Sequence, residues 1–468
     1  MTTCRITDGG ILLMLMKTGA VNGKIWDLRP ESPINDEAMP GYGTRKTNMK
    51  HKTIPPLAAL QTHFGYETFR GFQEEVINTL IAGDDALVLM PTGGGKSLCY
   101  QIPAVCMPGT GVVVSPLIAL MQDQVEAARR AGIRAAFLNS SLSRTQAQII
   151  ECNLCSGALD LLYVSPERLS IPDFQRLLEQ ANLAFFAIDE AHCISQWGHD
   201  FRPEYLRILD TLDYFPDAPR IALTATADPA TKKEIIEKLG LEDARQFISS
   251  FDRPNIHYAV EERHDARLQM LHFIKDTHSG DSGIVYCASR QKVEETAEWL
   301  SQHGIPALPY HAGQSSTRRK QHQLRFLKEE HLVMVATIAF GMGVDKGDVN
   351  FVVHMDMPGS LEGYYQETGR AGRNGQPGCH ALMLYGMQDV YRLKRMVEES
   401  ECPEDNGEYK KIQLQKIQKV LQFCKTSRCR RQMLLEYFGE KATGPCNNCD
   451  TCDQTPMHRP SNTGFIAL

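Results

Sequence analysis

The chain has 468 residues, of which 42% are hydrophobic and 23% charged, and this composition is typical of a soluble globular protein with real cores. At about 150 residues per domain, the length predicts about three domains. No apolar run approaches the roughly 18 residues of a membrane span. The short run at residues 11–16 lacks the flanks of a signal peptide. We therefore expect neither a membrane-spanning segment nor an export signal.

The charge balance and the cysteine content narrow the class of protein further. A formal net charge of −6 excludes a nucleic-acid binder that is basic over its whole surface, but not one with a local basic patch. The 14 cysteines lie in a long chain without an export signal. They predict a reducing, cytoplasmic environment, with thiols or metal ligands in place of disulfides.

The hydrophobic pattern of the chain changes at about residue 53. Residues 1–52 sustain no period of 2 or 3.6 and predict a disordered extension. Over residues 53–250, short buried strands alternate with helical patterns, which predicts a doubly wound parallel sheet. The expected strands are residues 86–90, 111–115, 159–164, 183–188 and 220–224, and the expected helices include residues 117–131 and 231–239.

A second α/β domain is expected over residues 251–398. The link between the two domains is expected near residues 249–255, where the letters FDRPN break both periods. The expected strands are residues 283–287, 332–336, 350–354 and 381–385, and the expected helices are residues 291–303 and 316–328.

The last part of the chain, residues 399–455, predicts a small helical module followed by a polar tail at residues 456–468. Residues 410–431 contain eight lysines and arginines and no acidic residue. This basic stretch is either a site of sequence-independent contacts to nucleic-acid phosphates or a solvated helix face. Apolar residues at helical spacing predict a helical hairpin here: Ile412, Ile417, Leu421, Leu434, Leu435 and Phe438.

A glycine-rich segment, PTGGGKS at residues 91–97, follows the expected strand 86–90 and precedes a helical pattern. Glycines let backbone N–H groups surround phosphate oxygens, a lysine reaches the β- and γ-phosphates, and a serine ligates Mg²⁺. Met90 stands where the usual pattern begins with glycine; a chance match in a surface turn is the alternative. The segment predicts a nucleoside triphosphate site made by Thr92, Gly93, Gly94, Gly95, Lys96 and Ser97.

A pair of carboxylates, Asp189 and Glu190, ends the expected strand 183–188 and opens the letters DEAH. A carboxylate at a strand end can hold Mg²⁺ and its neighbour can polarise an attacking water. We assign Asp189 to the metal and Glu190 to the water. Alone, such a pair is equally typical of a helix cap, and the glycine-rich segment one sheet away favours the catalytic interpretation.

Two arginines of the second domain, Arg370 and Arg373, follow Gln366 in the letters QETGRAGR. Residues three apart share a helix face, so we expect both arginines on one face of a helix. Arginines that reach a transferring phosphoryl group accelerate hydrolysis by roughly 10³–10⁵. A solvated helix terminus is the alternative. Gln366, Arg370 and Arg373 are therefore catalytic candidates together with Lys96 and Glu190.

Four cysteines near the end of the chain have the spacing C-x16-C-x2-C-x2-C: Cys429, Cys446, Cys449 and Cys452. Four thiolates close a tetrahedral Zn²⁺ site and leave no position open for catalysis, so we expect a structural zinc. Cys152 and Cys155 also have C-x2-C spacing, but no second pair lies near them in the sequence. We interpret that pair as coincidental.

Together, residues 60–452 resemble the superfamily-two helicases and, more narrowly, the RecQ family of DNA helicases. The segments 115–124 and 163–168 resemble those that follow the DNA backbone, and 286–290, 310–311 and 336–346 resemble the second-domain set. Gly71-Phe72 and Gly347 stand where the family commonly has Pro-Gly and Pro. The resemblance implies adenine contacts by Tyr66, Arg70 and Gln73, and coupling of hydrolysis to motion by Thr224 and Thr226.

The most discriminating likeness to the RecQ family is the segment SQWGHDFRPEY at residues 195–205. In that family such a loop binds single-stranded DNA and signals to the ATP site, which implies this role for Gln196, Trp197, Phe201 and Arg202. The chemistry agrees, because aromatic side chains stack on bases for roughly 1–3 kcal/mol each and an arginine suits a phosphate. Core packing is the alternative for Trp197.

The family implies a fold of two tandem RecA-like domains followed by a zinc-binding module, with ATP, Mg²⁺ and Zn²⁺ as cofactors. It implies an ATP-dependent DNA helicase or translocase of repair and recombination, moving 3′→5′ on single-stranded and tailed duplex DNA. The protein would lie at the nucleoid in a bacterium or in the nucleus of a eukaryote. Expected partners are a single-stranded-DNA-binding protein and other repair factors, and we expect a monomer.

Family members usually continue past the zinc module into a winged-helix domain, whereas only about 16 residues follow Cys452 here. ATP hydrolysis and translocation are therefore safer expectations than efficient unwinding. Three alternatives stay open: an RNA helicase of the DEAH type, a binding module whose ATPase has decayed, and a factor that remodels or anneals DNA.

Overall fold

The computed structural model describes residues 54–116, 118–198, 200–338, 340, 346–400 and 406–453. All of them belong to one compact unit, residues 51–468. The expected extension at residues 1–52 and the expected tail at residues 456–468 lie outside the described residues. So do eight positions of the family-like segments, namely Leu117, His199, Ala339 and residues 341–345.

The first domain is built on a sheet of seven described strands in the order β3-β4-β2-β5-β6-β1-β7. Every pair in it is parallel. The strands are β1 Ala86–Leu89, β2 Thr110–Val114, β3 Ala135–Leu138, β4 Leu161–Val164, β5 Leu183–Ile188, β6 Arg220–Thr224 and β7 Arg245–Ile248.

Helices enclose this sheet, which places one apolar core on each of its faces. Along β2, Val112 and Val114 belong to one core and Val113 to the other, because successive side chains of a strand point to opposite faces. The helices are α1 Pro56–Phe64, α2 Gln73–Ala82, α3 Leu98–Cys106, α4 Ile118–Arg130, α5 Arg144–Cys155, α6 Pro166–Leu169, α7 Pro172–Gln180, η1 Ala191–Ile194, η2 Pro203–Arg207, α8 Ile208–Leu212 and α9 Pro229–Leu239.

The second domain repeats the design with six described strands in the order β10-β11-β9-β12-β13-β8, again all parallel. The strands are β8 Ile256–Glu262, β9 Ser282–Tyr286, β10 Ala307–Tyr310, β11 Val333–Ala336, β12 Val349–His354 and β13 Cys379–Tyr385. Its helices are α10 Ala266–Thr277, α11 Arg290–Gln302, α12 Ser316–Lys328 and α13 Leu361–Thr368. Residues 249–255 join β7 to β8 and so pass from one sheet to the other.

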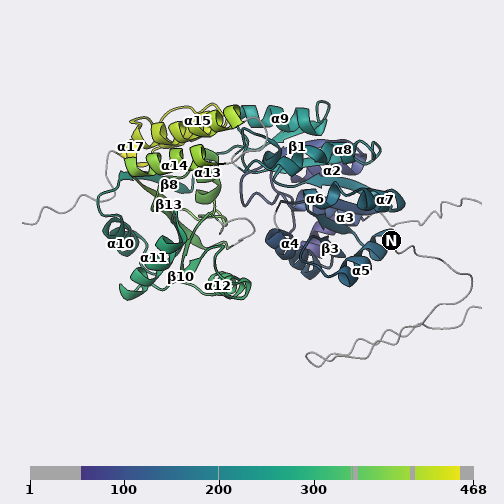
Figure 1. Cartoon of the computed structure of the whole chain (residues 1–468), viewed down its shortest axis with the longest axis horizontal. Helices are drawn as coiled ribbons and strands as arrows, with labels where there is room; N and C mark the ends of the chain where they lie inside the picture. The colour runs from purple at the N-terminus through teal and green to yellow at the C-terminus, as the bar shows by residue number, and fades with distance from the viewer. Residues whose placement is uncertain are drawn as a thin grey trace, which may run out of the picture. The chain divides into compact units, whose positions relative to one another are not determined.

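The C-terminal elements pack on the second sheet. They are α14 Met387–Glu399, α15 Asn406–Lys425, α16 Arg430–Tyr437 and α17 Asp450–Asp453. Helices α14 and α15 lie side by side (Figure 1), and Ile417, Val420 and Phe423 of α15 join the same apolar core as strands β9 and β12. Within the described residues, no helix is long and apolar enough to cross a membrane.

Candidate nucleotide and zinc sites

The phosphate-binding candidate is the loop between β1 and α3, residues 90–97. Gly93 and Gly95 have positive φ angles of 83° and 80°, a left-handed conformation that side chains rarely adopt. A Cβ atom added to Gly94 would lie 2.6 Å from Cγ of Met90. The methionine at the position usually held by glycine therefore fills the space that a glycine at 94 leaves open.

Lys96 points back along its own loop. Its Nζ donates hydrogen bonds to the carbonyl oxygens of Met90, at 3.0 Å, and Pro91, at 3.5 Å. Burial lowers the pKa of Lys96, whereas the carboxylates of Glu190 and Asp189 raise it. The ammonium group is thus held by carbonyl oxygens beside two acids. This donor set fits an anionic phosphate ligand, whose charge would stabilise the ammonium form.

Asp189 and Glu190 follow β5 as the sequence predicts. The Asp189 carboxylate accepts a hydrogen bond from the Glu190 amide at 3.0 Å, and Glu190 itself has a positive φ of 48°. Burial and the neighbouring Glu190 charge raise the pKa of Asp189 to about 7. Two carboxylates crowded in a buried place fit a divalent cation, which would relieve their repulsion.

His192, the last residue of the DEAH letters, connects the acids to the strand-end threonines. Its Nδ1 lies 2.8 Å from Oγ1 of Thr224 and 3.3 Å from Oε2 of Glu190. The Thr224 hydroxyl donates to the Thr226 carbonyl at 3.1 Å and accepts from the Thr226 amide at 3.2 Å. His192 was not among the predicted site residues, although its place in the DEAH letters was a usable signal.

Arg370 and Arg373 do not lie on a helix, so the helix-face prediction is wrong. Helix α13 carries Gln366 but ends at Thr368, and both arginines stand in the turn that follows. The turn needs glycine: Gly372 has a φ of 60°, and a Cβ atom there would lie 2.2 Å from Nδ2 of Asn255. In place of a shared helix face, a tight turn presents the two arginines.

The turn brings Arg373 to the phosphate loop. A Cβ atom on Gly93 would lie 3.3 Å from Cγ of Arg373, and the Arg373 charge lowers the pKa of Lys96. Arg370 is buried, with 4% of its surface exposed. Both arginine charges lower the pKa of Tyr286 at the end of β9, although burial raises that pKa more strongly. The two sheets therefore contribute to one charged cluster.

The residues predicted to contact adenine lie beside the same loop. Gln73 is buried, and its Nε2 donates to the carbonyl oxygens of Gly94 and Gly95, each at 3.2 Å. Its Oε1 accepts from the Arg70 amide at 2.9 Å. The Arg70 guanidinium lies 5.8 Å from the centre of the Tyr66 ring, and Tyr66 is half exposed. Their adenine-binding role stays a prediction.

The segment at residues 195–205 contacts the residues just before it: the Ser195 amide donates to the His192 carbonyl and the Arg202 amide to the Cys193 carbonyl. Trp197 and Phe201 are both partly exposed, which disfavours the alternative that Trp197 is a core residue. Phe201 lies 6.2 Å, centre to centre, from the Tyr409 ring of α15. Arg202 donates to the Pro116 carbonyl at 2.7 Å and pairs with Asp200 at 3.1 Å. Gln196 is also partly exposed.

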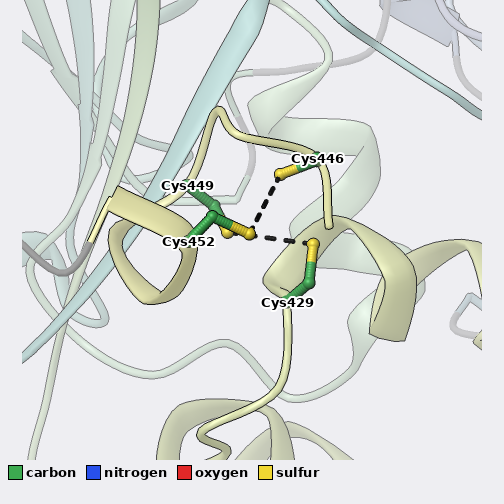
Figure 2. A group of neighbouring side chains, drawn as sticks. All are labelled: Cys429, Cys446, Cys449 and Cys452. Atoms are coloured by element: carbon green, nitrogen blue, oxygen red, sulfur yellow. Dashed lines mark hydrogen bonds between the residues drawn. The ribbon is translucent and has the colours of Figure 1, made fainter. Parts of the chain in front are cut away.

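Figure 2 shows the four cysteines pointing toward one another. The Sγ atoms of Cys429, Cys446, Cys449 and Cys452 all lie within 4.8 Å of one another. The Cys446–Cys452 and Cys429–Cys449 sulfur pairs are each 3.9 Å apart. Tetrahedral Zn²⁺ with Zn–S bonds of about 2.3 Å would place the sulfurs about 3.8 Å apart, so the cluster fits zinc. Cys152 and Cys155 lie apart from it, exposed on α5.

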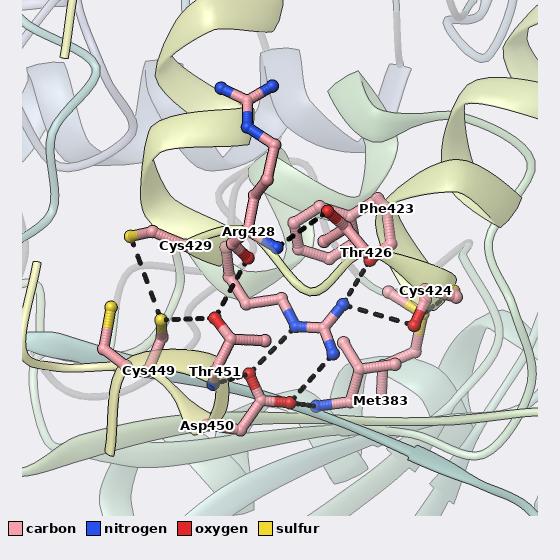
Figure 3. Close-up of polar contacts among 12 residues, drawn as sticks. Met383, Phe423, Cys424, Thr426, Arg428, Cys429, Cys449, Asp450 and Thr451 are labelled. Carbon is pink, nitrogen blue, oxygen red and sulfur yellow. Dashed lines mark hydrogen bonds and ion pairs between the residues drawn. The ribbon is translucent and has the colours of Figure 1, made fainter. Parts of the chain in front are cut away.

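A two-pronged ion pair ties the two cysteine-bearing segments together; Figure 3 labels its acid, Asp450, and the cysteines Cys429 and Cys449. Arg430, next to Cys429, binds Asp450, next to Cys449, through Nε–Oδ1 at 2.9 Å and Nη2–Oδ2 at 3.0 Å. Burial acts to raise the pKa of the Cys449 thiol. Hydrogen bonds with Thr451 and nearby groups outweigh burial and lower this pKa to about 7. At Cys449 this favours the thiolate that a metal needs, whereas burial raises the pKa of Cys446 and Cys452.

The basic stretch at residues 410–431 is partly used inside the protein. Lys416, Arg430 and Arg431 are buried in ion pairs with Glu362, Asp450 and Asp252. At most five of its eight cations are therefore available to a nucleic acid.

Family comparisons agree with the three-part architecture. Residues 70–235 match the DEAD/DEAH box helicase family, residues 265–375 the helicase conserved C-terminal domain, and residues 387–453 the RecQ zinc-binding family. The chain is 49% identical over 401 residues to an ATP-dependent DNA helicase RecQ of Haemophilus influenzae, covering 86% of this chain and 64% of that protein. The chain belongs to the RecQ family.

Other RecQ relatives are similar over the same region. The RecQ of Bacillus subtilis is 41% identical, covering 85% of this chain and 66% of that protein. A RecQ-like DNA helicase BLM of Xenopus laevis is 41% identical, covering 83% of this chain and 30% of that one. The chain thus spans less than two thirds of the length of these curated relatives.

Solved structures support the fold. The DEAD-box helicase Mss116 bound to single-stranded RNA matches with a TM-score of 0.60 at 15% identity, over 82% of this chain and 90% of that one. The helicase MrfA bound to DNA matches with a TM-score of 0.61 at 18% identity, over 78% and 55%. The predicted fold class, family resemblance and zinc-binding module are confirmed.

Proposed function

We propose that this chain is an ATP-dependent DNA helicase or translocase that couples ATP hydrolysis to movement on single-stranded DNA. The observation that carries the proposal is the convergence of Lys96, the Asp189–Glu190 pair and Arg373 on one site, although they come from two separate sheets. Its RecQ relatives are named ATP-dependent DNA helicases, which supports DNA as the polymer and repair and recombination as the setting.

The proposed roles follow from the chemistry of the side chains. Lys96 binds the β- and γ-phosphates within the amides of residues 92–95. Ser97 and Asp189 hold Mg²⁺, which neutralises phosphate charge when bound. Glu190 orients the attacking water. Arg370 and Arg373 stabilise the negative charge of the transition state, with Gln366 beside them, and Tyr66, Arg70 and Gln73 hold the adenine.

The link from His192 to Thr224 and Thr226 supports a route from the ATP site to DNA. Glu190 lies 3.3 Å from His192, and hydrogen bonds continue from His192 to Thr224 and from Thr224 to Thr226. The segment with Trp197 follows directly in sequence. A change at the γ-phosphate would thus shift the Trp197–Arg202 loop, which grips bases and phosphates.

The finer features of the proposal come from the family. Movement is 3′→5′ on single-stranded or tailed duplex DNA, and the protein acts as a monomer with single-stranded-DNA-binding protein and other repair factors. It works in the cytoplasm of a bacterium, at the nucleoid, or in a eukaryotic nucleus.

The decisive experiment is strand separation of a 3′-tailed DNA duplex with ATP and Mg²⁺, with Lys96→Ala as background. We expect separation above that background and none with a 5′-tailed duplex. ATP hydrolysis is measured in the same tube with DNA or RNA of equal length. DNA-stimulated hydrolysis without strand separation would indicate a remodelling or annealing factor, preferential stimulation by RNA an RNA helicase, and no hydrolysis at all a binding module.

A further inference from the structure

The segment that joins the two sheets, residues 249–255, places a buried arginine between them. Arg253 has 9% of its surface exposed. Its Nη1 donates to the Gly369 carbonyl at 3.0 Å and the Thr92 carbonyl at 3.4 Å. Its Nη2 donates to the carbonyls of Ala371, at 2.8 Å, and Gly372, at 3.3 Å.

These four acceptors belong to two functional loops. Thr92 lies in the phosphate loop, and residues 369–372 form the turn that carries Arg370 and Arg373. The turn is not helical, so its carbonyl groups need partners from elsewhere. Asn255 supplies one more, because its Nδ2 donates to the Gly372 carbonyl at 2.9 Å. One side chain, that of Arg253, thus contacts both loops.

The zinc-binding module holds the opposite side of the same segment. Arg431 pairs with Asp252 at 2.6 Å. The Glu440 carboxylate accepts from the Ser250 hydroxyl at 2.7 Å and from the Phe251 amide at 2.8 Å. Both anchors hold the residues just before Arg253: Arg431 lies on α16 and Glu440 lies just after that helix.

Apolar packing and a further amide complete this attachment. The Phe251 ring stacks on Phe438 with 4.6 Å between centres and 13° between planes. Nδ2 of Asn448, which stands between Cys446 and Cys449, donates to the Pro254 carbonyl at 2.9 Å. The segment that carries Arg253 is therefore fixed on the zinc-binding module.

We propose that Arg253 is a positioning residue for ATP hydrolysis: it holds the turn bearing Arg370 and Arg373 against the phosphate loop, and the zinc-binding module fixes it through the joining segment. The inference rests on the proposed function. Arg253 acts through the two arginines and not on the nucleotide, so it governs the rate of the chemical step. A lysine has the charge but lacks the planar fork that serves several carbonyls at once.

The first test compares Arg253→Ala and Arg253→Lys with a matched control, Arg220→Gln. Arg220 also bonds main-chain carbonyls, those of Leu239 and Leu212, but both lie within the first domain. Misplacement of catalytic groups costs about 10- to 100-fold, so we expect that loss of kcat in Arg253→Ala, with little change in KM for ATP. Arg253→Lys should recover part of it.

Thermal unfolding of each variant separates positioning from folding. If Arg253→Ala lost no more kcat per folded molecule than Arg220→Gln, or if KM alone rose, the proposal would be overturned. Wild-type protein that fails to hydrolyse ATP with DNA would instead refute the proposed function itself.

A double variant identifies the group through which Arg253 acts. Because the two residues are proposed to work as a unit, Arg253→Ala combined with Arg373→Ala should be no slower than Arg373→Ala alone. If the double variant instead showed the product of the two single losses of kcat, the proposal would be contradicted.

The contribution of the zinc-binding module is tested by Glu440→Gln, which weakens the grip on Ser250 and Phe251. We expect a smaller fall in kcat than in Arg253→Ala, with zinc content unchanged. Glu436→Gln is the control, because its carboxylate pairs with the exposed Arg428 of the same module at 2.5 Å and not with the joining segment. Equal kcat in Glu440→Gln and Glu436→Gln would show that the zinc-binding module does not help to position Arg253.

Discussion

At the scale of single residues, a change at Trp197 tests the proposed response to DNA separately from the ATP chemistry. Its side chain is partly exposed, five positions after His192. Loss of a stacking face worth roughly 1–3 kcal/mol per base should therefore affect the response to DNA more than the basal reaction.

The prediction is that Trp197→Ala lowers DNA-stimulated ATP turnover about tenfold or more, while turnover without DNA changes little. Steady-state hydrolysis with and without single-stranded DNA measures both. Trp299→Ala, on α11 of the second domain, is the matched control. Equal loss of stimulated and basal turnover in Trp197→Ala would indicate a packing role.

A second residue-scale feature is a group of histidines at the edge of the second sheet. Nε2 of His278 lies 3.0 Å from Nδ1 of His380, and Nδ1 of His278 lies 2.8 Å from Asp281. His257 packs on His380 at 5.3 Å and pairs with Asp453. Burial, together with the charges of His278 and His257, lowers the pKa of His380 to about 4.

A lowered histidine pKa makes stability fall in acid. Above about pH 6.5 His380 is neutral in both states, whereas between about pH 6.5 and 4 the unfolded chain binds the proton and the folded one does not. We expect this proton binding to lower the free energy of unfolding by roughly 1–3 kcal/mol between about pH 6.5 and 4. His380→Gln should flatten the fall in urea unfolding at pH 7.5 and 5, and His264→Gln, at an exposed position, should not.

At the scale of elements, the strands predicted from sequence are the inner ones. Runs such as Phe185–Ile188 are buried on both faces and therefore continuously apolar. The strands that were missed, β3, β7, β8 and β10, are the four edges of the two sheets. An edge strand has a neighbour on one side alone, so its sequence tolerates polar residues: β7 reads Arg-Gln-Phe-Ile, with Phe247 buried.

In the candidate site, too, contiguous motifs could be predicted, whereas contacts between distant residues could not. The phosphate loop and the carboxylate pair are contiguous motifs and could be predicted. The turn at residues 369–373 looked helical because the sequence does not reveal that Gly372 has a positive φ. The role of Arg253 could not be predicted, because its partner Thr92 is 161 positions away in the chain. The letters FDRPN carry no pattern that indicates this contact.

The zinc-binding module offers an element-scale prediction. A structural zinc contributes directly to folding free energy, so Cys449→Ser should abolish zinc binding and lower the unfolding temperature. Zinc released on denaturation is measured with a chromophoric chelator. Cys152→Ser, an exposed cysteine on α5, should change neither quantity; undiminished zinc in Cys449→Ser would disprove the ligand set.

Another element-scale prediction concerns the buried pair of Lys416 on α15 and Glu362 at the start of α13, 2.7 Å apart. Removing one partner leaves a buried charge, which costs about 3–5 kcal/mol. Lys416→Met should therefore destabilise the protein strongly in urea unfolding. The double variant with Glu362→Met should lose less than the sum of the two single losses; strict additivity would show that the pair does not interact.

At the scale of the whole molecule, the proposed DNA binding must rest on local cations because the net charge is −6. Lys411 and Lys419 of α15 are exposed. If both contact phosphates of single-stranded DNA, replacing them with Gln should reduce the slope of log affinity against log salt by about 0.7 per contact. Lys233→Gln, at an exposed position of α9, should leave the slope unchanged. An unaltered slope in the double variant would place the DNA path elsewhere.

The zinc-binding module also covers the outer edge of β8, the last strand of the second sheet. Asp450 accepts the Val260 amide, Arg431 and Asn448 bond the Ile256 carbonyl, and Cys449 forms a bridge with Tyr258. An uncovered edge strand offers its free amides and carbonyls to other chains. Removal of the metal would therefore do more than loosen one end of the protein: it would expose a template for self-association, and zinc-stripped protein should aggregate through β8 before its two sheets unfold.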